Sequence, residues 1–257
     1  MAQPPDAGKK LLLQRGQKLR RQIQRVSGIP FRVEVIRRFA MALAASREYA
    51  SVQTQNYPSL EEKHLDHPRM FSDRTRLISS MRSVRGGVIA EVGVAEGEFS
   101  EYLLNELRPR KFVAIDIFTM HEVPRFGHLW FDNMTHLDYY KRRFADRGGQ
   151  VIIENGMGHV TLAKYPDKSF DLIYIDADHS YEAVKEDTNV AKAKLADNGF
   201  IVFNDYIMFD HLNGMPYGVV QAVNELIVSE DWRVCGFSLE KNMFCDIAIR
   251  KQSGPRL

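Results

Sequence analysis

From about residue 86 onward, short apolar runs alternate with longer amphipathic segments, and this alternation predicts the fold. Five runs read as buried strands: residues 87–93, 111–118, 150–156, 170–178 and 199–206. The segments between them are long enough for crossover helices. The pattern therefore predicts an α/β domain with a doubly wound, mostly parallel sheet.

Two more apolar runs lie near the C-terminus. Residues 232–239 and 243–250 are separated only by the polar segment Glu240-Lys241-Asn242. A connection this short joins antiparallel neighbours. We expect an antiparallel hairpin at the edge of the sheet, which brings the expected number of strands to seven.

The first 50 residues follow a different pattern. Two amphipathic helices are expected there, one from about residue 9 to 28 and one over 31–45, on a background of eleven Lys or Arg and three Asp or Glu. This arm has a net charge of +8, so the rest of the chain has −6 for a total of +2. The sequence thus predicts a basic N-terminal helical extension, residues 1–80, and a catalytic domain, residues 81–257.

The basic arm could meet an anionic membrane surface, a nucleic acid or the acidic body of a partner subunit, or it could be a solvated helix face. Because its apolar stripes need a partner, we expect packing on the body or on another subunit, hence a homo-oligomer. Peripheral membrane contact is the alternative, and no nucleic acid partner is expected.

Composition excludes several classes of protein. The chain has no apolar run of about 18 residues, and its N-terminus lacks the pattern of a secretory signal. Cys235 and Cys245 stand in apolar, strand-like contexts and not at metal-ligand spacing, so we expect reduced core residues. A cytoplasmic location follows as an expectation.

A glycine-containing turn follows the first strand. Gly93 permits a tight turn or close backbone approach, and Gly97 lets the next helix begin against the strand or a ligand. The turn lacks the Gly-x-Gly of dinucleotide-binding proteins, and Glu91 and Glu96 would repel a pyrophosphate but suit a cationic ligand. Nineteen residues after Gly97 the second strand ends in Asp116, a usual place for an acid that binds two ribose hydroxyls. A turn and a strand end without any ligand remain the alternative.

Together, the acidic-Gly-x-x-x-Gly turn and Asp116 resemble the class I S-adenosylmethionine-dependent methyltransferases. The resemblance implies a Rossmann-like fold and S-adenosyl-L-methionine as cofactor, a sulfonium without phosphate. It places the turn near the methionine moiety, Asp116 near the ribose and residues 155–157 near the adenine. The cofactor-binding residues that it implies are Glu91, Gly93, Gly97, Asp116, Asn155, Gly156, Met157 and Asp176.

Polar residues also end the fourth and fifth strands. Asp176 follows one strand, and Asn204 and Asp205 follow the next. Adjacent parallel strands are about 5 Å apart, so these oxygen-bearing side chains can converge at one sheet edge. Oxygen ligands with room for water and substrate suit Mg²⁺.

The segments DADHSYEAV, GFIVFNDY and YGVVQAVNEL narrow the resemblance. Over roughly residues 86–250 the chain is similar to the subfamily of macrocin-type sugar O-methyltransferases and cephalosporin-hydroxylase-like proteins. This resemblance implies a metal held by Asp176, Asn204 and Asp205. Asn204 departs from an all-carboxylate set and contributes no charge, which puts a required metal in doubt.

Two residues are candidate bases for removing a proton from an acceptor hydroxyl. Asp178 matches a base proposed for the sugar enzymes, and His179 aligns with the basic position of catechol-type enzymes. Alternatively, Asp178 caps the following helix and His179 is a fixed hydrogen-bond donor. The sequence does not choose between them.

The predicted function is an S-adenosylmethionine-dependent O-methyltransferase that acts on a small hydroxylated acceptor, a sugar or glycoconjugate, with Mg²⁺ as a candidate second cofactor. N-methylation of a small amine is a second enzyme hypothesis. A non-catalytic binding module that docks through its basic arm is the alternative from another class.

Overall fold

The computed structural model describes Arg47, residues 57–123 and residues 131–251. Two compact units divide the chain, one of residues 1–55 and 209–215, the other of residues 56–208 and 216–257. The sheet and the candidate site belong to the second unit. The two helices expected within residues 9–45 lie outside the described residues.

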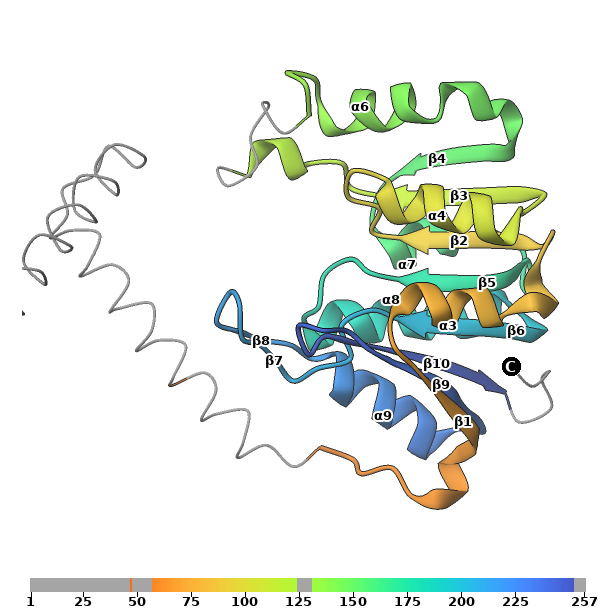
Figure 1. Ribbon diagram of the computed structural model, residues 1–257, viewed down its shortest axis with the longest axis vertical. Helices are drawn as coiled ribbons and strands as arrows, with labels where there is room; N and C mark the ends of the chain where they lie inside the picture. The colour runs from red at the N-terminus through yellow and green to blue at the C-terminus, as the bar shows by residue number, and fades with distance from the viewer. Residues whose placement is uncertain (1–46, 48–56, 124–130, 252–257) are drawn as a thin grey trace, which may run out of the picture. The chain divides into compact units, whose positions relative to one another are not determined.

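Figure 1 shows the described helices and strands in chain order. The strands are β1 (Leu65–Phe71), β2 (Val88–Val92), β3 (Lys111–Asp116), β4 (Val151–Asn155), β5 (Phe170–Ile175), β6 (Leu195–Phe203), β7 (Phe209–Asp210), β8 (Met215–Pro216), β9 (Trp232–Leu239) and β10 (Cys245–Lys251). The helices are α3 (Arg74–Ser80), α4 (Glu98–Leu107), α6 (His136–Arg143), α7 (Gly158–Leu162), α8 (Tyr181–Lys194) and α9 (Val219–Ser229). Short 3₁₀ turns are η1 (Glu62–His64), η2 (Arg82–Val84), η3 (Met120–Glu122) and η4 (Ala145–Gln150).

The main sheet confirms the predicted α/β class and every strand expected from the apolar runs. Its order is β1-β9-β10-β6-β5-β2-β3-β4, and β7 and β8 pair separately. The central strands are parallel, and β10 runs antiparallel to both β6 and β9. The hairpin β9–β10 is thus the expected antiparallel addition.

The sheet has eight strands and not the expected seven, because β1 pairs in parallel with β9. The sequence of β1, LDHPRMF, is polar and contains Pro68, and four of its seven residues are exposed. Proline is tolerated in edge strands, which need only one side of the ladder. The described sheet therefore begins at Leu65, ahead of the domain boundary expected at residue 81.

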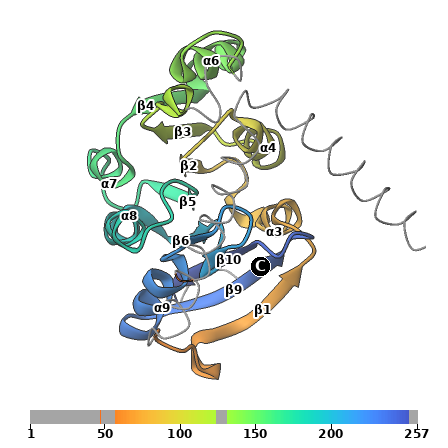
Figure 2. The same cartoon turned by 90° about the vertical axis from the view of Figure 1, so that its left-hand side faces the viewer.

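Helices cover both faces of the sheet, as doubly wound topology requires. Figure 2 shows α7, α8 and α9 on one face and α3 and α4 on the other. Alternation along each strand divides the core accordingly: Val88, Ala90 and Val92 of β2 pack in one buried cluster, while Ile89 packs in the other. This two-sided burial explains why the central strands read as continuous apolar runs.

The register of the parallel strands brings their carboxyl ends to one edge. Val92 of β2 pairs with Ile115 of β3 and with Ile175 of β5, and Ile175 pairs with Phe203 of β6. The residues that follow these strand ends are those singled out from the sequence. The fold therefore places all of them along one edge of the sheet.

Cys235 and Cys245 are buried free cysteines, as expected. Burial raises the pKa of the Cys245 thiol to about 11, so this residue stays in the unreactive thiol form near neutral pH.

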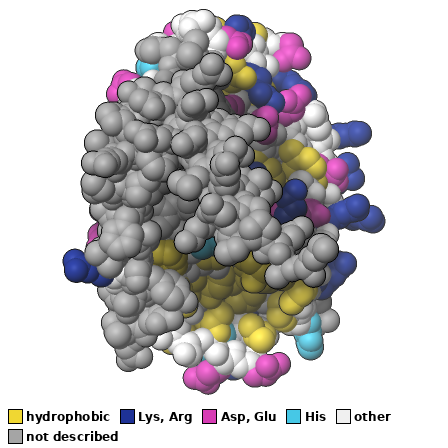
Figure 3. All heavy atoms as spheres, turned by 60° about the vertical axis from the view of Figure 1, so that its left-hand side comes forward, with side chains coloured by type: hydrophobic (Ala, Val, Ile, Leu, Met, Phe, Trp, Pro, Cys, Tyr) yellow, Lys and Arg dark blue, Asp and Glu magenta, His cyan; other side chains and the backbone are white. Residues whose placement is uncertain are grey.

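Apolar side chains are also exposed in the described part of the chain (Figure 3). A groove of about 270 Å³ is lined mostly by apolar side chains, among them the half-buried Leu60, Leu65 and Phe237 and the exposed Met70. No helix of the described residues is long and apolar enough to cross a membrane.

Candidate active site

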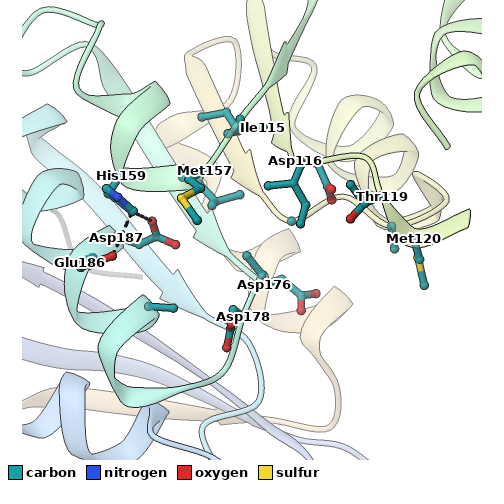
Figure 4. A pocket seen from close by; sticks show the side chains of 18 of the residues that line it. Ile115, Asp116, Thr119, Met120, Met157, His159, Asp176, Asp178, Glu186 and Asp187 are labelled. Carbon is teal, nitrogen blue, oxygen red and sulfur yellow. Dashed lines mark ion pairs between the residues drawn. The ribbon is translucent and has the colours of Figure 1, made fainter. Parts of the chain in front are cut away.

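A cavity of about 450 Å³ lies at the carboxyl ends of β2, β3, β4 and β5. Its volume is in the usual range for sites of small ligands. Figure 4 shows Asp116, Thr119 and Met120 on one side, His159, Glu186 and Asp187 on another, and Asp176 and Asp178 between them. The lining residues are Val92, Gly93, Ala95, Ile115, Asp116, Ile117, Thr119, Met120, His136, Gly156, Met157, Gly158, His159, Asp176, Ala177, Asp178, Ala183, Glu186 and Asp187.

Gly93 is required by close packing as well as by backbone conformation. Its φ is +84°, and a Cβ at this position would lie 2.0 Å from the carbonyl oxygen of Asp176. The turn after β2 can therefore touch the chain after β5 only if residue 93 has no side chain. Gly97 also has φ of +84°, but it faces the rings of Phe144 and Tyr140 and does not line the cavity.

Backbone donors hold the Asp116 carboxylate at the cavity wall. Its Oδ2 accepts from the Val94 N–H at 2.9 Å, and its Oδ1 accepts from the Phe118 N–H at 2.7 Å. Each oxygen keeps a lone pair for a further donor. Asp116 is thus fixed where it could accept hydrogen bonds from two neighbouring hydroxyl groups.

Glu91 has a different place from the one expected. It is buried outside the cavity lining, and its carboxyl accepts a hydrogen bond from Ser100 of α4, which accepts one from Tyr140 at 2.8 Å. Burial raises the pKa of Glu91 to about 8, so its carboxyl is mostly protonated at neutral pH. The expected repulsion or attraction of a ligand by a Glu91 charge therefore has no support here. The predicted contact with the cofactor stays a prediction.

The end of β4 contributes two of its three predicted residues to the cavity. Gly156 and Met157 line it, whereas Asn155 does not. A Cβ on Gly156 would lie 2.8 Å from the Thr161 hydroxyl oxygen, which explains the glycine there.

The sequence analysis missed three polar residues on the same side of the cavity. His159 Nδ1 of α7 lies 3.5 Å from a carboxylate oxygen of Glu186 and 3.5 Å from one of Asp187, both on α8 (Figure 4). Burial raises the pKa of Asp187, and His159 opposes that shift. Glu186 and Asp187 lie in the middle of α8 and His159 is the second residue of the short helix α7, so no turn motif marks them in the sequence.

The second group of predicted residues converges on His179. Its Nε2 lies 3.4 Å from Asn204 Oδ1, 3.7 Å from Asp176 Oδ1 and 3.7 Å from Asp205 Oδ2. The ring stacks on Tyr217, with centroids 4.5 Å apart and planes 9° apart. Because Nε2 faces three oxygen acceptors, it is the nitrogen that carries hydrogen.

A buried residue of β10 sets the orientation of Asn204. Asp246 Oδ1 accepts from Asn204 Nδ2 at 3.1 Å, and Asp246 Oδ2 accepts from the Tyr174 hydroxyl at 2.7 Å. The amide N–H₂ group thus faces Asp246, and the amide oxygen is left to face His179. Burial raises the pKa of Asp246 to about 6. Nothing in the sequence near Asp246 signals this role, since it depends on pairing of β10 with β6.

This arrangement does not fit the predicted Mg²⁺ site. The oxygens of Asp176, Asn204 and Asp205 face a common point, but His179 Nε2 occupies it, at distances well beyond the roughly 2.1 Å that Mg²⁺ needs. A cation there would require His179 to leave and the oxygens to close in. Within residues 57–123 and 131–251, no group of three or more His, Cys, Asp or Glu side chains forms a metal site.

The two candidate bases are separated by the fold. Asp178 is exposed at the cavity wall, where its Oδ1 accepts from the Ser180 N–H at 2.8 Å. This bond lies in the turn before α8, but the N-cap of that helix is Ser180, whose hydroxyl accepts from the Ala183 N–H, so the alternative in which Asp178 caps the helix is wrong. His179 does not line the cavity and is held by its oxygen partners and Tyr217.

A methylated sulfonium nucleoside fits the chemistry of the cavity. The cavity is lined by the turn at Gly93, by the Asp116 carboxylate and by the apolar side chain of Met157. Acidic side chains outnumber histidines in its lining. Carboxylates favour a cationic ligand and disfavour a phosphate. The residues present therefore fit S-adenosyl-L-methionine better than a dinucleotide.

Comparisons with known proteins agree with this fit. Residues 90–206 match a family model described as a methyltransferase domain. Cofactor-bound Rv0187 from MTB has the same fold, with a TM-score of 0.52, 13% identity and coverage of 99% of this chain and 100% of its own. No curated protein matched the chain.

Two further solved structures are similar at a lower score. A protein from Corynebacterium glutamicum has a TM-score of 0.48 and 16% identity, with 85% of this chain and 96% of its own covered. The B. subtilis tRNA methyltransferase TrmK has a TM-score of 0.48 and 13% identity, with 72% and 67% covered.

The fold and the cavity define a Rossmann-like α/β enzyme domain with its ligand site at the carboxyl ends of the strands. The family model, which covers residues 90–206 and so less than half of the chain, supports a methyltransferase that uses S-adenosyl-L-methionine. The narrower similarity to macrocin-type sugar enzymes is not confirmed by these comparisons.

Proposed function

We propose that this enzyme transfers a methyl group from S-adenosyl-L-methionine to a hydroxyl of a small acceptor, a sugar or glycoconjugate. The observation that carries the proposal is the position of Asp178, an exposed carboxylate at the wall of the cavity, next to the cluster around His179. Such a carboxylate can accept the proton that an attacking hydroxyl must lose.

The proposed reaction is an in-line displacement. When bound, S-adenosyl-L-methionine supplies an electrophilic methyl group on its sulfonium. The acceptor oxygen would bond to that carbon as the carbon–sulfur bond breaks and its electron pair goes to sulfur, so the residues of this chain would have to hold the acceptor hydroxyl in line with the methyl group. Asp178 would accept the hydroxyl proton. Asp176 and Asp116 line the cavity at the ends of β5 and β3. Orientation of the hydroxyl against the methyl group accounts for much of the rate.

We assign His179 a positioning role. Its Nε2–H is directed at Asn204, Asp176 and Asp205, and its ring lies against Tyr217. It thereby fixes the chain after β5, including its neighbour Asp178. No step is assigned to Mg²⁺, because His179 fills the place among the predicted ligands. Unchanged turnover after treatment with a chelator supports this part, and loss of turnover restored by Mg²⁺ contradicts it.

A screen of acceptors with a labelled methyl donor tests the function. Purified enzyme is offered sugars, glycosides and amines in parallel, and the methylated atom is located by mass spectrometry and NMR. O-methylated products from hydroxylated acceptors are expected. Methylation of nitrogen alone would replace the proposal with the N-methyltransferase hypothesis.

The predicted homo-oligomer and peripheral membrane contact depend on the basic arm of residues 1–50, and they stay part of the proposal together with the predicted cytoplasmic location. Light scattering of the full chain checks the oligomer. Sedimentation with anionic vesicles at low and high salt checks the membrane contact, since surface attraction weakens as salt rises.

A further inference from the structure

The charge of the cavity leaves one part of the cofactor without a partner. Five acidic side chains line it, and no Lys or Arg does among the residues that the structure describes. S-adenosyl-L-methionine carries two positive groups, the sulfonium and the α-ammonium, and one carboxylate. The acidic wall favours the first two and opposes the carboxylate. A guanidinium or ammonium close to this wall would offset that opposition.

Arg74, the first residue of α3, is placed to meet this need. Its Nη1 lies 3.6 Å from Oδ2 of Asp176, which lines the cavity. Its guanidinium carbon lies 4.2 Å from the ring centroid of Phe99, two residues after Gly97. The guanidinium thus lies between the helix that follows the glycine turn and the end of β5, the two segments expected beside the methionine moiety.

The guanidinium has five N–H groups, and its near polar partners are the Tyr174 hydroxyl and the carboxyl groups of Asp176 and Asp246, so N–H groups remain for a further acceptor. The 3.6 Å separation from Asp176 is an ion-pair distance and is too long for a good hydrogen bond. About a third of the side chain, 36%, is exposed. Stacking on Phe99 restrains the plane without using an N–H group. Arg74 is therefore oriented, charged and able to donate to a carboxylate in the forked geometry that guanidinium groups favour.

We propose that Arg74 binds the carboxylate of the methionine moiety of S-adenosyl-L-methionine. The inference rests on the proposed cofactor. It makes residues of the predicted N-terminal extension part of the cofactor site, because α3 precedes residue 81.

The matched probes are S-adenosyl-L-methionine and its decarboxylated form, which differ only in the carboxylate. Calorimetry measures the affinity of both for the full-length wild type, Arg74→Gln, Arg74→Lys and Arg76→Gln. Arg76 is an exposed residue of the same helix, so its variant controls for loss of one positive charge from α3. No acceptor is present, so binding alone is read.

We expect Arg74→Gln to bind S-adenosyl-L-methionine about 10- to 100-fold more weakly, the usual effect of losing a hydrogen-bonded charge. Its affinity for the decarboxylated form should change less than about threefold, and Arg74→Lys should be intermediate. Arg76→Gln should match the wild type with both probes. The affinity for the decarboxylated form also reports whether each variant retains a folded site.

Two results overturn the inference while leaving the cofactor assignment intact. One is equal weakening of both probes in Arg74→Gln, which would give Arg74 a purely structural role. The other is unchanged binding of S-adenosyl-L-methionine in that variant. Failure of the wild type to bind either probe would instead overturn the cofactor assignment, and this inference with it.

Discussion

The cofactor half and the acceptor half of the site are built in different ways. Around β2 and β3 the geometry depends mainly on the backbone. Gly93 packs against the chain after β5, and two backbone N–H groups donate to the Asp116 carboxylate. Around β5 and β6 the geometry depends on side chains that contact other side chains, with His179 among three oxygens and Asp246 behind them. The first half should therefore fail when the backbone is disturbed, and the second when one polar partner changes.

Adding a methyl group at Gly93 tests the backbone half and should have the largest effect. Gly93→Ala places a Cβ 2.0 Å from a backbone oxygen at a positive φ, so the turn must shift. We expect a loss of roughly 2–5 kcal/mol of unfolding free energy, from backbone strain and overpacking together. Urea unfolding measures the loss.

Gly86→Ala is the matched control, because Gly86 has φ of +73° and nothing within 4 Å of its ideal Cβ. It should show the strain alone, about 1–2 kcal/mol. Equal losses in both variants would mean that the contact with the Asp176 carbonyl oxygen contributes nothing.

Neutralising Asp178 tests the side-chain half. Asp178→Asn keeps the size of the side chain but removes the proposed proton acceptor, so kcat should fall about 10²- to 10⁴-fold. His179→Gln should lower kcat less than Asp178→Asn does, and kcat of this variant should still depend on pH. Steady-state kinetics from pH 5 to 9 measure both.

Asp197→Asn controls for loss of a carboxylate, since Asp197 is exposed and pairs with Lys168 outside the cavity. It should leave kcat unchanged. A full loss of activity in His179→Gln with a nearly active Asp178→Asn would exchange the roles assigned to the two residues.

The buried carboxyl of Glu91 makes a pH-dependent contribution to stability, which per pH unit is the smallest of the predicted effects. Its pKa is raised from 4.5 to about 8, so the folded state binds the proton more strongly than the unfolded state. Unfolding free energy should therefore be highest below about pH 4.5 with respect to this group and fall as pH rises towards 8, by at most about 1.4 kcal/mol per pH unit.

Glu91→Gln removes the ionisable carboxyl and should flatten this part of the plot of unfolding free energy against pH. Urea unfolding of wild type and variant at pH 5, 6.5 and 8 measures the difference. Identical slopes in wild type and variant would mean that Glu91 is ionised in the folded protein. Glu91 would then carry the negative charge that the sequence analysis expected.

The sequence predicted the fold well because strands buried on both faces leave continuous apolar runs. It missed β1, whose polar residues and Pro68 suit an edge strand but resemble a loop. The sequence also correctly predicted that the residues at the ends of β2, β3, β5 and β6 lie along one edge of the sheet, because parallel register determines that placement.

The finer arrangement was harder to predict. Glu91, Gly97 and Asn155 match sequence motifs but lie outside the cavity lining, and sequence spacing does not show which side of a turn a residue faces. Arg74 and Asp246 carry no motif, and they reach the site only through contacts between distant segments. Those contacts depend on how α3 and β10 pack against the rest of the domain, and the local pattern of apolar and polar residues does not predict that packing.

The central claim is that the cavity binds S-adenosyl-L-methionine through Asp116 at its ribose. Calorimetry of the full chain with S-adenosyl-L-methionine tests it most directly, with Asp116→Ala beside the wild type. The account predicts one site per chain in the wild type and a loss of affinity of at least tenfold in Asp116→Ala, which removes the carboxylate held by Val94 and Phe118. No binding by the wild type, or equal affinity in Asp116→Ala, would contradict it.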